Sequence, residues 1–149
     1  MKRSKNPMNK IKKLPPFVPL LWGMLNCKSY IELPPSAAKA LPYFLGKVKI
    51  AFNDPCRLST IFSFSYKEAD LLGFAPATFS KIIMDLVKHG FLDPVDKGGL
   101  RGDCKSNNLF CLSQRWKLFG QTDFQFKDWK CFFPRKKAAS KSETYNLNL

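Results

Sequence analysis

Apolar residues recur at helical spacing between Phe17 and Leu25, and this pattern predicts a first helix that begins near Pro19. The helix should end near Asn26 or Cys27. A basic N-terminus followed by an apolar run is also typical of a secretory signal, but prolines interrupt the start of this run and it is too short to span a bilayer. We therefore interpret it as a segment that packs in the protein core, and we expect no membrane partner.

A second helical pattern extends from about Pro35 to Lys47. Pro42 lies inside it and should kink the helix or divide it, because a proline ring removes one backbone hydrogen bond and crowds the preceding turn. Residues 51–58 contain the sequence Asn-Asp-Pro, which is typical of a loop.

A denser series of local signals begins after residue 60. The alternation over residues 61–64 is compatible with a short strand, and Ser65 and Glu68 follow in the S-x-x-E pattern of a helix capping box. In such a box, the hydroxyl and the carboxylate bind backbone amides that the first helical turn leaves unpaired. A short helix should therefore run to about Leu72, and Gly73 can supply the left-handed conformation of a tight turn.

A longer helix is predicted from Pro76 to His89, with Gly90 placed to end it. We expect His89, the only histidine, to act at the helix end as a cap and not in catalysis, because the helix dipole favours an imidazolium there. Five apolar positions fall on one face and should be buried: Phe79, Ile82, Ile83, Leu86 and Val87. The opposite face should expose Thr78, Lys81, Asp85 and Lys88.

A β-hairpin is predicted after this helix. Residues 91–95 and 109–112 are strand-like, and the segment between them is polar and rich in glycine. The strand at 61–64 can join this pair as a third member. Three cations lie among the polar residues of the connection: Lys97, Arg101 and Lys105.

The chain carries a formal net charge of +14, from 25 basic and 11 acidic residues. Such an excess attracts polyanions, of which nucleic acid and an anionic membrane surface are the obvious candidates. Two polar, basic segments, residues 1–13 and 135–149, carry much of the excess, and we expect both to be disordered tails. The part between them is rich enough in apolar residues to form one core.

The five cysteines show neither a CxxC pair nor a metal-ligand spacing, and their number is odd. A disulfide framework and a zinc site are therefore not expected, and a reducing cytoplasm fits this composition better. The sequence also contains no phosphate-binding loop and no nucleophile motif. We expect no metal, no cofactor and no enzymatic activity.

The order of capped helix, glycine turn, longer helix and basic hairpin over residues 59–113 resembles the winged helix-turn-helix DNA-binding superfamily of bacterial, phage and plasmid proteins. The resemblance implies a mainly α domain over residues 14–120, with a small β-hairpin and extra N-terminal helices. It also implies stoichiometric binding of double-stranded DNA, by a sequence-specific transcriptional regulator or a replication-associated protein. A homodimer is compatible with this, because paired half-sites match a two-fold axis.

In such a domain the longer helix enters the major groove with the residues near its N-terminus. The hairpin places its cations on phosphates or in a minor groove. Asp85 would repel phosphate, so the contact face should end about there. The helix residues that this arrangement places against DNA are Ala77, Thr78, Ser80, Lys81 and Lys88.

Residues 121–134 form an aromatic C-terminal extension in which phenylalanines and Trp129 alternate with charged residues. Aromatic rings beside cations can stack on unpaired bases. Because bulky aromatics are usually buried, we expect the extension to pack against the first helices or a second subunit.

Two other interpretations of the chain remain open. A winged helix can bind another protein, which predicts little affinity for duplex DNA. Alternatively, residues 17–25 could lie on a membrane surface as an interfacial helix.

Overall fold

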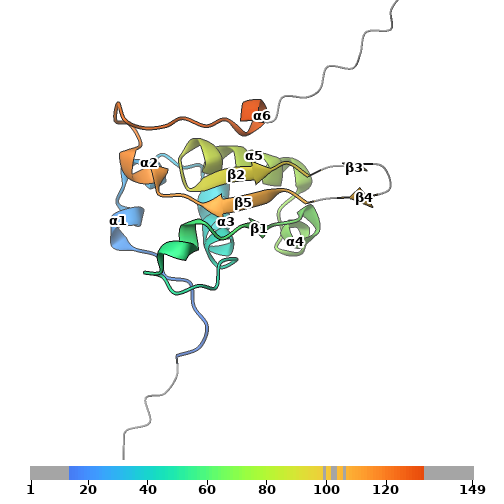
Figure 1. Ribbon diagram of the computed structural model, residues 1–149, viewed down its shortest axis with the longest axis horizontal. Helices are drawn as coiled ribbons and strands as arrows, with labels where there is room; N and C mark the ends of the chain where they lie inside the picture. The colour runs from blue at the N-terminus through green and yellow to red at the C-terminus, as the bar shows by residue number, and fades with distance from the viewer. Residues whose placement is uncertain (1–13, 99, 102–103, 106, 133–149) are drawn as a thin grey trace, which may run out of the picture.

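The computed structural model describes residues 14–98, 100–101, 104–105 and 107–132 (Figure 1). The predicted tails at 1–13 and 135–149 lie outside these residues, as do the side chains of residues 100–105, 131 and 132. The α-helices are α1 (Trp22–Leu25), α2 (Lys28–Ile31), α3 (Pro35–Leu45), α4 (Tyr66–Leu71), α5 (Pro76–Lys88) and α6 (Trp129–Phe132). The 3-10 helices are η1 (Pro55–Leu58) and η2 (Arg115–Leu118), and the strands are β1 (Phe62–Ser63), β2 (Leu92–Asp96), β3 (Leu100–Arg101), β4 (Cys104–Lys105) and β5 (Leu109–Leu112).

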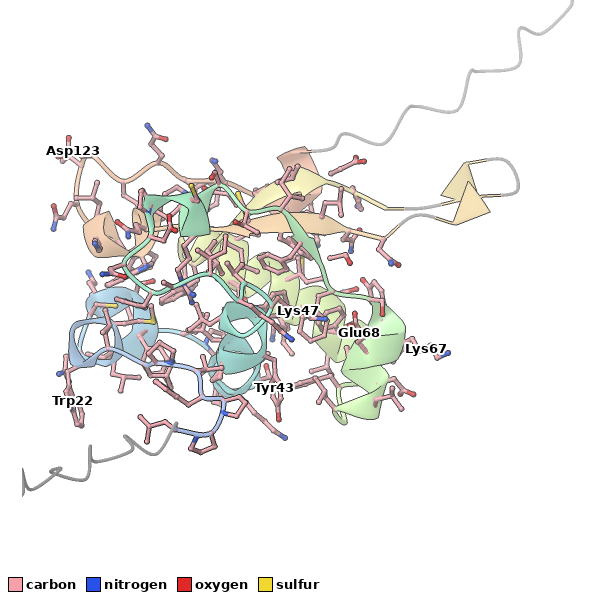
Figure 2. All side chains as sticks on the ribbon, turned by 60° about the horizontal axis from the view of Figure 1, so that its bottom comes forward. Trp22, Tyr43, Lys47, Lys67, Glu68 and Asp123 are labelled. Carbon is pink, nitrogen blue, oxygen red and sulfur yellow. The ribbon has the colours of Figure 1, made fainter. Side chains whose placement is uncertain are left out.

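The first predicted helix ends at its C-cap Asn26, as expected, but it begins later than predicted and most of its apolar residues are exposed. Leu21 is extended, with φ −74° and ψ 141°, so α1 begins only at Trp22, and a separate helix, α2, follows it. Phe17 is 70% exposed and Trp22 78% exposed, and Figure 2 shows Trp22 pointing away from the body. Met24 is the residue of this run that joins the core. The prediction that this segment packs in the core is therefore wrong, because a proline-rich extended chain does not gather its apolar side chains on one face.

α3 is a single continuous helix with Pro42 inside it, so of the two predicted effects, a kink or a division, the division is wrong. Pro42 lies in the last turn, where the missing N–H costs one hydrogen bond and little helix remains to be displaced. Its own carbonyl still accepts a hydrogen bond from the Gly46 N–H at 2.9 Å. The predicted loop at 51–58 includes η1, which begins where the Asp54 carboxylate accepts a hydrogen bond from the Cys56 N–H at 2.9 Å.

The capping box and the turn between α4 and α5 are confirmed. The Ser65 hydroxyl accepts a hydrogen bond from the Glu68 N–H at 3.1 Å, and the Glu68 carboxylate accepts one from the Ser65 N–H at 2.8 Å. Gly73 has φ +88°, a conformation that side chains with a Cβ rarely adopt. All five apolar positions predicted for the inner face of α5 are fully buried.

The predicted hairpin strands, β2 and β5, are confirmed, and β1 joins them in a three-stranded antiparallel sheet of order β1-β5-β2. The register places Phe62 opposite Phe110 and Leu92 opposite Leu112. β3 and β4 pair with each other beyond the body of the protein, as Figure 1 shows. The described part of the chain is thus a mixed α/β fold in which helices pack on one small sheet.

Aromatic rings form the centre of the core. The Phe44 ring on α3 lies 4.6 Å from the Phe64 ring and 5.8 Å from the Phe110 ring, measured between centroids. Trp129 of α6 belongs to the same core, with its ring 5.4 Å from that of Phe110. Trp129 therefore brings the C-terminal extension to the sheet and α5, whereas the sequence predicted that the extension packs against the first helices or a second subunit. Phe126 is 61% exposed.

His89 is the C-cap residue of α5, where the sequence predicted a helix-end role. It is buried, and its Nδ1 lies 3.0 Å from the Ser29 carbonyl oxygen. The Ser29 hydroxyl donates a hydrogen bond to the His89 carbonyl at 2.6 Å, and the Phe119 ring stacks on the imidazole. The pair joins α2 to the end of α5.

Within the described residues, none of the helices is long and apolar enough to cross a membrane.

Candidate nucleic-acid interface

The outer face of α5 is accessible where the sequence predicted it. Ala77, Thr78, Lys81 and Lys88 are all exposed. At about 100° per residue, Lys81 and Lys88 lie roughly half a turn from the centre of the buried face. Two ammonium groups therefore occupy the middle of the exposed surface of this helix.

Ser80, a predicted DNA contact, is half-buried and already hydrogen-bonded. Its hydroxyl lies 2.7 Å from that of Tyr66, the first residue of α4, and the Tyr66 and Phe79 rings are nearly perpendicular with their centroids 5.1 Å apart. The Ser80 side chain thus ties α4 to α5. The structure places it at the border of the exposed face and not in its middle.

Asp85 is also half-buried, so the prediction that it lies exposed beside the lysines is wrong. Its Oδ2 is buried, and among the described residues it accepts no hydrogen bond. An unsatisfied buried acceptor costs about 1–3 kcal/mol. The carboxylate is therefore a local weakness in α5 as well as a negative charge close to the two lysines.

A hollow of about 680 Å³ runs beside α5, between this helix and the base of the hairpin. It brings together three of the predicted site residues, Ala77, Ser80 and Lys97. The Gly98 N–H donates a hydrogen bond to the Asn108 side-chain oxygen at 2.9 Å, which closes the base of the hairpin. Other residues lining the hollow are Tyr66, Met84, Trp129 and Lys130.

Of these lining residues, Trp129 and Lys130 come from α6 and were not predicted as part of the site. The Lys97 ammonium lies 5.8 Å from the centroid of the Trp129 ring, so Lys97 belongs to the hairpin base and not to its tip. The alternation of aromatics and cations in residues 124–130 was the signal that pointed to this region. What sequence could not show is that α6 lies beside α5.

The other two hairpin cations lie on the paired strands farther out. Arg101 pairs with Cys104 and Lys105 with Leu100 in the β3–β4 register. The side chains of Arg101 and Lys105 are outside the described part of the chain, so their predicted role as phosphate contacts stays a prediction.

Arg115 and Gly90 fix the hairpin relative to α5. The Arg115 guanidinium donates to the carbonyls of Val87 and Leu92, both at 2.8 Å, and to the Asp93 carboxylate at 2.7 Å. Gly90, with φ +88°, lets the backbone of η2 approach so closely that a Cβ there would lie 2.6 Å from the Trp116 nitrogen. The last turn of α5 and the first hairpin strand are therefore held as one unit.

Two titratable groups, one on α4 and one on β5, have shifted pKa values. Lys47 forms an ion pair with Glu68, toward which it points in Figure 2. This ion pair, together with the hydrogen bond from the Ser65 N–H, lowers the pKa of the Glu68 carboxyl. Burial and the neighbouring Asp93 carboxylate raise the pKa of the Cys111 thiol, partly offset by Lys127.

In the described ranges, no three His, Cys, Asp or Glu side chains gather in a way that could hold a metal ion.

Comparison with known proteins gives this chain no relative. No family model matches it, and no match was found among curated proteins or solved structures.

Proposed function

We propose that this protein is a winged-helix protein that binds double-stranded DNA, with α5 in the major groove and the β2–β5 hairpin on the flanking backbone. The observation that carries the proposal is the two-sided character of α5. Its inner face is fully buried, whereas Lys81 and Lys88 stand in the middle of an accessible outer face. An α-helix fits the major groove of DNA, where its ammonium groups can reach phosphates or guanine edges.

The neighbours of α5 support the same placement. α4 is anchored to α5 by the hydrogen bond between Tyr66 and Ser80, which is the bracing that a helix-turn-helix needs. The paired strands β3 and β4 extend beyond the body, as a wing does (Figure 1). Arg115 holds the base of that hairpin against the end of α5, so the two proposed contacts would approach DNA together.

Thr78 and Lys81 are the proposed base-reading residues, because they are exposed in the first two turns of α5. Thr78 can contact a thymine methyl group, and Lys81 can donate to a guanine edge. Lys88 and the hairpin cations are assigned to phosphates. Ser80 is assigned to the brace.

Selection of duplexes from a random pool by the full chain, followed by titration at several salt concentrations, tests the proposal. We expect one sequence family to be enriched and the affinity to fall steeply with salt, because each phosphate contact releases counterions. Lys81→Ala should weaken binding by about 1–3 kcal/mol and relax one position of the selected sequence. Arg101→Ala should mainly reduce the affinity and the salt slope.

Lys49→Ala is the matched control, since Lys49 is an exposed lysine after α3 that lines a hollow to which no residue of α5 contributes. It should bind like the parent chain. If no sequence is enriched and the affinity does not change with salt, the protein is not a DNA-binding protein of this kind, and a winged helix that binds another protein becomes the better interpretation.

A further inference from the structure

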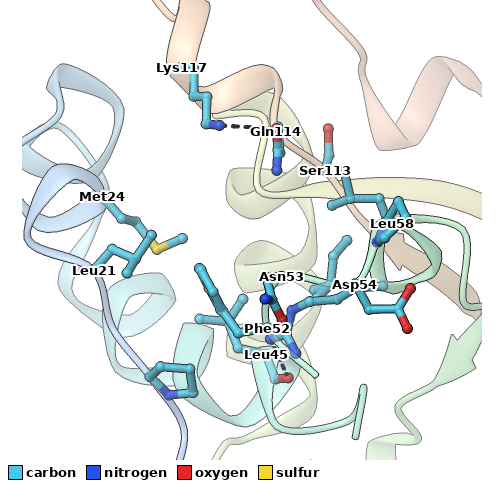
Figure 3. A pocket seen from close by; sticks show the side chains of 14 residues that line it. Leu21, Met24, Leu45, Phe52, Asn53, Asp54, Leu58, Ser113, Gln114 and Lys117 are labelled. Carbon is cyan, nitrogen blue, oxygen red and sulfur yellow. Dashed lines mark hydrogen bonds between the residues drawn. The ribbon is translucent and has the colours of Figure 1, made fainter. Parts of the chain in front are cut away.

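Residues 14–20 form an extended strap, which lies on the surface near the C-terminal end of α3. Beneath it is a hollow of about 730 Å³, which we call the strap hollow. Its size is within the range of about 300–1,000 Å³ that is typical of small-molecule sites. A smaller hollow of about 300 Å³, drawn in Figure 3, shares Pro19, Leu45, Phe52 and Arg57 with it.

The walls of the strap hollow are apolar. Phe17 and Val18 come from the strap, and the opposite wall is made by Leu45 at the end of α3 with Val48, Ile50 and Phe52 after it. The Phe17 ring is 70% exposed and Phe52 is 47% exposed. These large apolar side chains remain accessible to solvent around a concave surface, so an apolar molecule placed there would remove them from water.

The polar groups of the strap hollow carry one sign of charge. Arg57 and Lys49 line it, and no acidic residue does within the described part of the chain. The nearby Asp54 carboxylate lines only the smaller hollow, accepts a hydrogen bond from the Cys56 N–H, and points away from Phe52 and Leu45 in Figure 3.

Arg57 is the unusual member of this site, because it is only 8% exposed. Its guanidinium donates to the carbonyls of Ile50, Val48 and Leu45 at 3.1, 3.3 and 3.4 Å, and it lies over the Phe52 ring at 5.6 Å. Within the described residues it forms no ion pair. A buried cation whose charge is met by carbonyl dipoles and one aromatic ring, without a carboxylate, is costly, and an anion brought next to it would offset that cost.

We propose that the strap hollow is a binding site for a small amphiphile that carries a carboxylate on an apolar chain. The apolar part would lie between Phe17, Leu45 and Phe52, and the carboxylate would face Arg57 and Lys49. The opposite arrangement, with a cationic head group, would place two like charges beside each other. This site is separate from the α5 face and does not depend on the proposed DNA binding.

Isothermal titration of the full chain with decanoate, below its micelle concentration, tests the proposal. Decanol and decyltrimethylammonium have the same chain length and serve as neutral and cationic probes. Decanoate should bind at least about tenfold more tightly than either, because a charge-assisted hydrogen bond contributes roughly that factor. Equal binding of decanoate and decyltrimethylammonium, or no binding of decanoate, would overturn the proposal.

Variants distinguish this site from general adsorption. Arg57→Gln should abolish the preference for decanoate. Because the hydrogen bonds from Arg57 to backbone carbonyls also support the fold, two variants at exposed positions, Lys49→Glu and Phe17→Ser, are tested beside it. Each of these two should weaken decanoate binding severalfold, whereas Lys67→Glu, on α4 and pointing away from the body in Figure 2, should not. Identical weakening by Lys49→Glu and Lys67→Glu would refute the site. Binding to anionic phospholipid vesicles without binding to decanoate would refute it as well.

Discussion

Replacing Gly90 by alanine tests how closely the end of α5, η2 and the hairpin are packed. Gly90 and Gly73 both have φ +88°, so an alanine at either position pays the same left-handed penalty, roughly 1 kcal/mol. The two differ in their surroundings. A Cβ at Gly73 would meet nothing within 4 Å, whereas one at Gly90 would lie 2.6 Å from the Trp116 nitrogen and 2.8 Å from the Arg115 carbonyl carbon.

These neighbours of Gly90 are backbone atoms, which cannot rotate away as a side chain can. η2 would have to move by several tenths of an ångström, and the hydrogen bond from the Trp116 N–H to the Gly90 carbonyl, 3.1 Å long, would be strained or lost. Overpacking of this kind costs about 1–3 kcal/mol. We therefore expect Gly90→Ala to lower the free energy of unfolding by about 3 kcal/mol, and Gly73→Ala by only about 1 kcal/mol.

Urea denaturation of the parent chain and the two variants, followed by tryptophan fluorescence and circular dichroism, measures the difference. The midpoint should shift clearly further for Gly90→Ala, and its thermal midpoint should fall by roughly 10 °C. Gly23→Ala, in α1 with nothing near its Cβ, should be neutral or slightly stabilising. Equal losses of stability for Gly90→Ala and Gly73→Ala would refute the close approach of η2.

Three further predictions concern single side chains. The pKa of Glu68 is lowered from its ordinary value of 4.5, so its ion pair with Lys47 stabilises the fold above that pH and is lost as the pH falls through the lowered value. The free energy of unfolding of Glu68→Gln, measured by urea titration, should therefore lie below that of the parent at pH 7. The difference should be less than about 1 kcal/mol, because the pair is partly exposed, and it should disappear in acid. A difference that grows in acid would contradict the lowered pKa. Asp85→Asn should raise duplex affinity in fluorescence anisotropy, because it removes a negative charge beside the proposed contact face, and lower affinity would contradict that placement. With its raised pKa, Cys111 should react with iodoacetamide at pH 8 more slowly than the exposed Cys56, as peptide mass spectrometry would show; the reverse order would count against its burial.

Local signals in the sequence were sufficient for β1, α4, α5, β2 and β5, whereas β3 and β4 lie in a segment that was predicted as a polar connection. The capping box depends on two residues three positions apart, and the buried face of α5 depends on helical periodicity, so both follow from the chain itself. The hairpin strands were equally readable, because glycine-rich polar residues separate two apolar runs. Thr78, Lys81 and Lys88 were placed on the exposed face for the same reason.

Predictions failed where a residue's environment is made by distant parts of the chain. Periodicity alone assigned the apolar residues 17–25 to the core, yet burial depends on whether other elements leave room for them. α3 and the sheet fill the core with little from this run beyond Met24. Ser80 was predicted to contact DNA because it lies near the start of α5, but its hydroxyl is hydrogen-bonded to that of Tyr66 on α4.

The sequence by itself determined that α4, α5, β2 and β5 form, and which side of α5 is polar. Only the tertiary structure decided what stands next to that face: Trp129 and Lys130 beside it, and Arg115 at the base of the hairpin. The reason is physical. Secondary structure follows from neighbours a few residues apart, whereas the Arg115 bonds to Val87 and the packing of Trp129 on Phe110 join residues 28 and 19 positions apart, brought together only when the whole core closes.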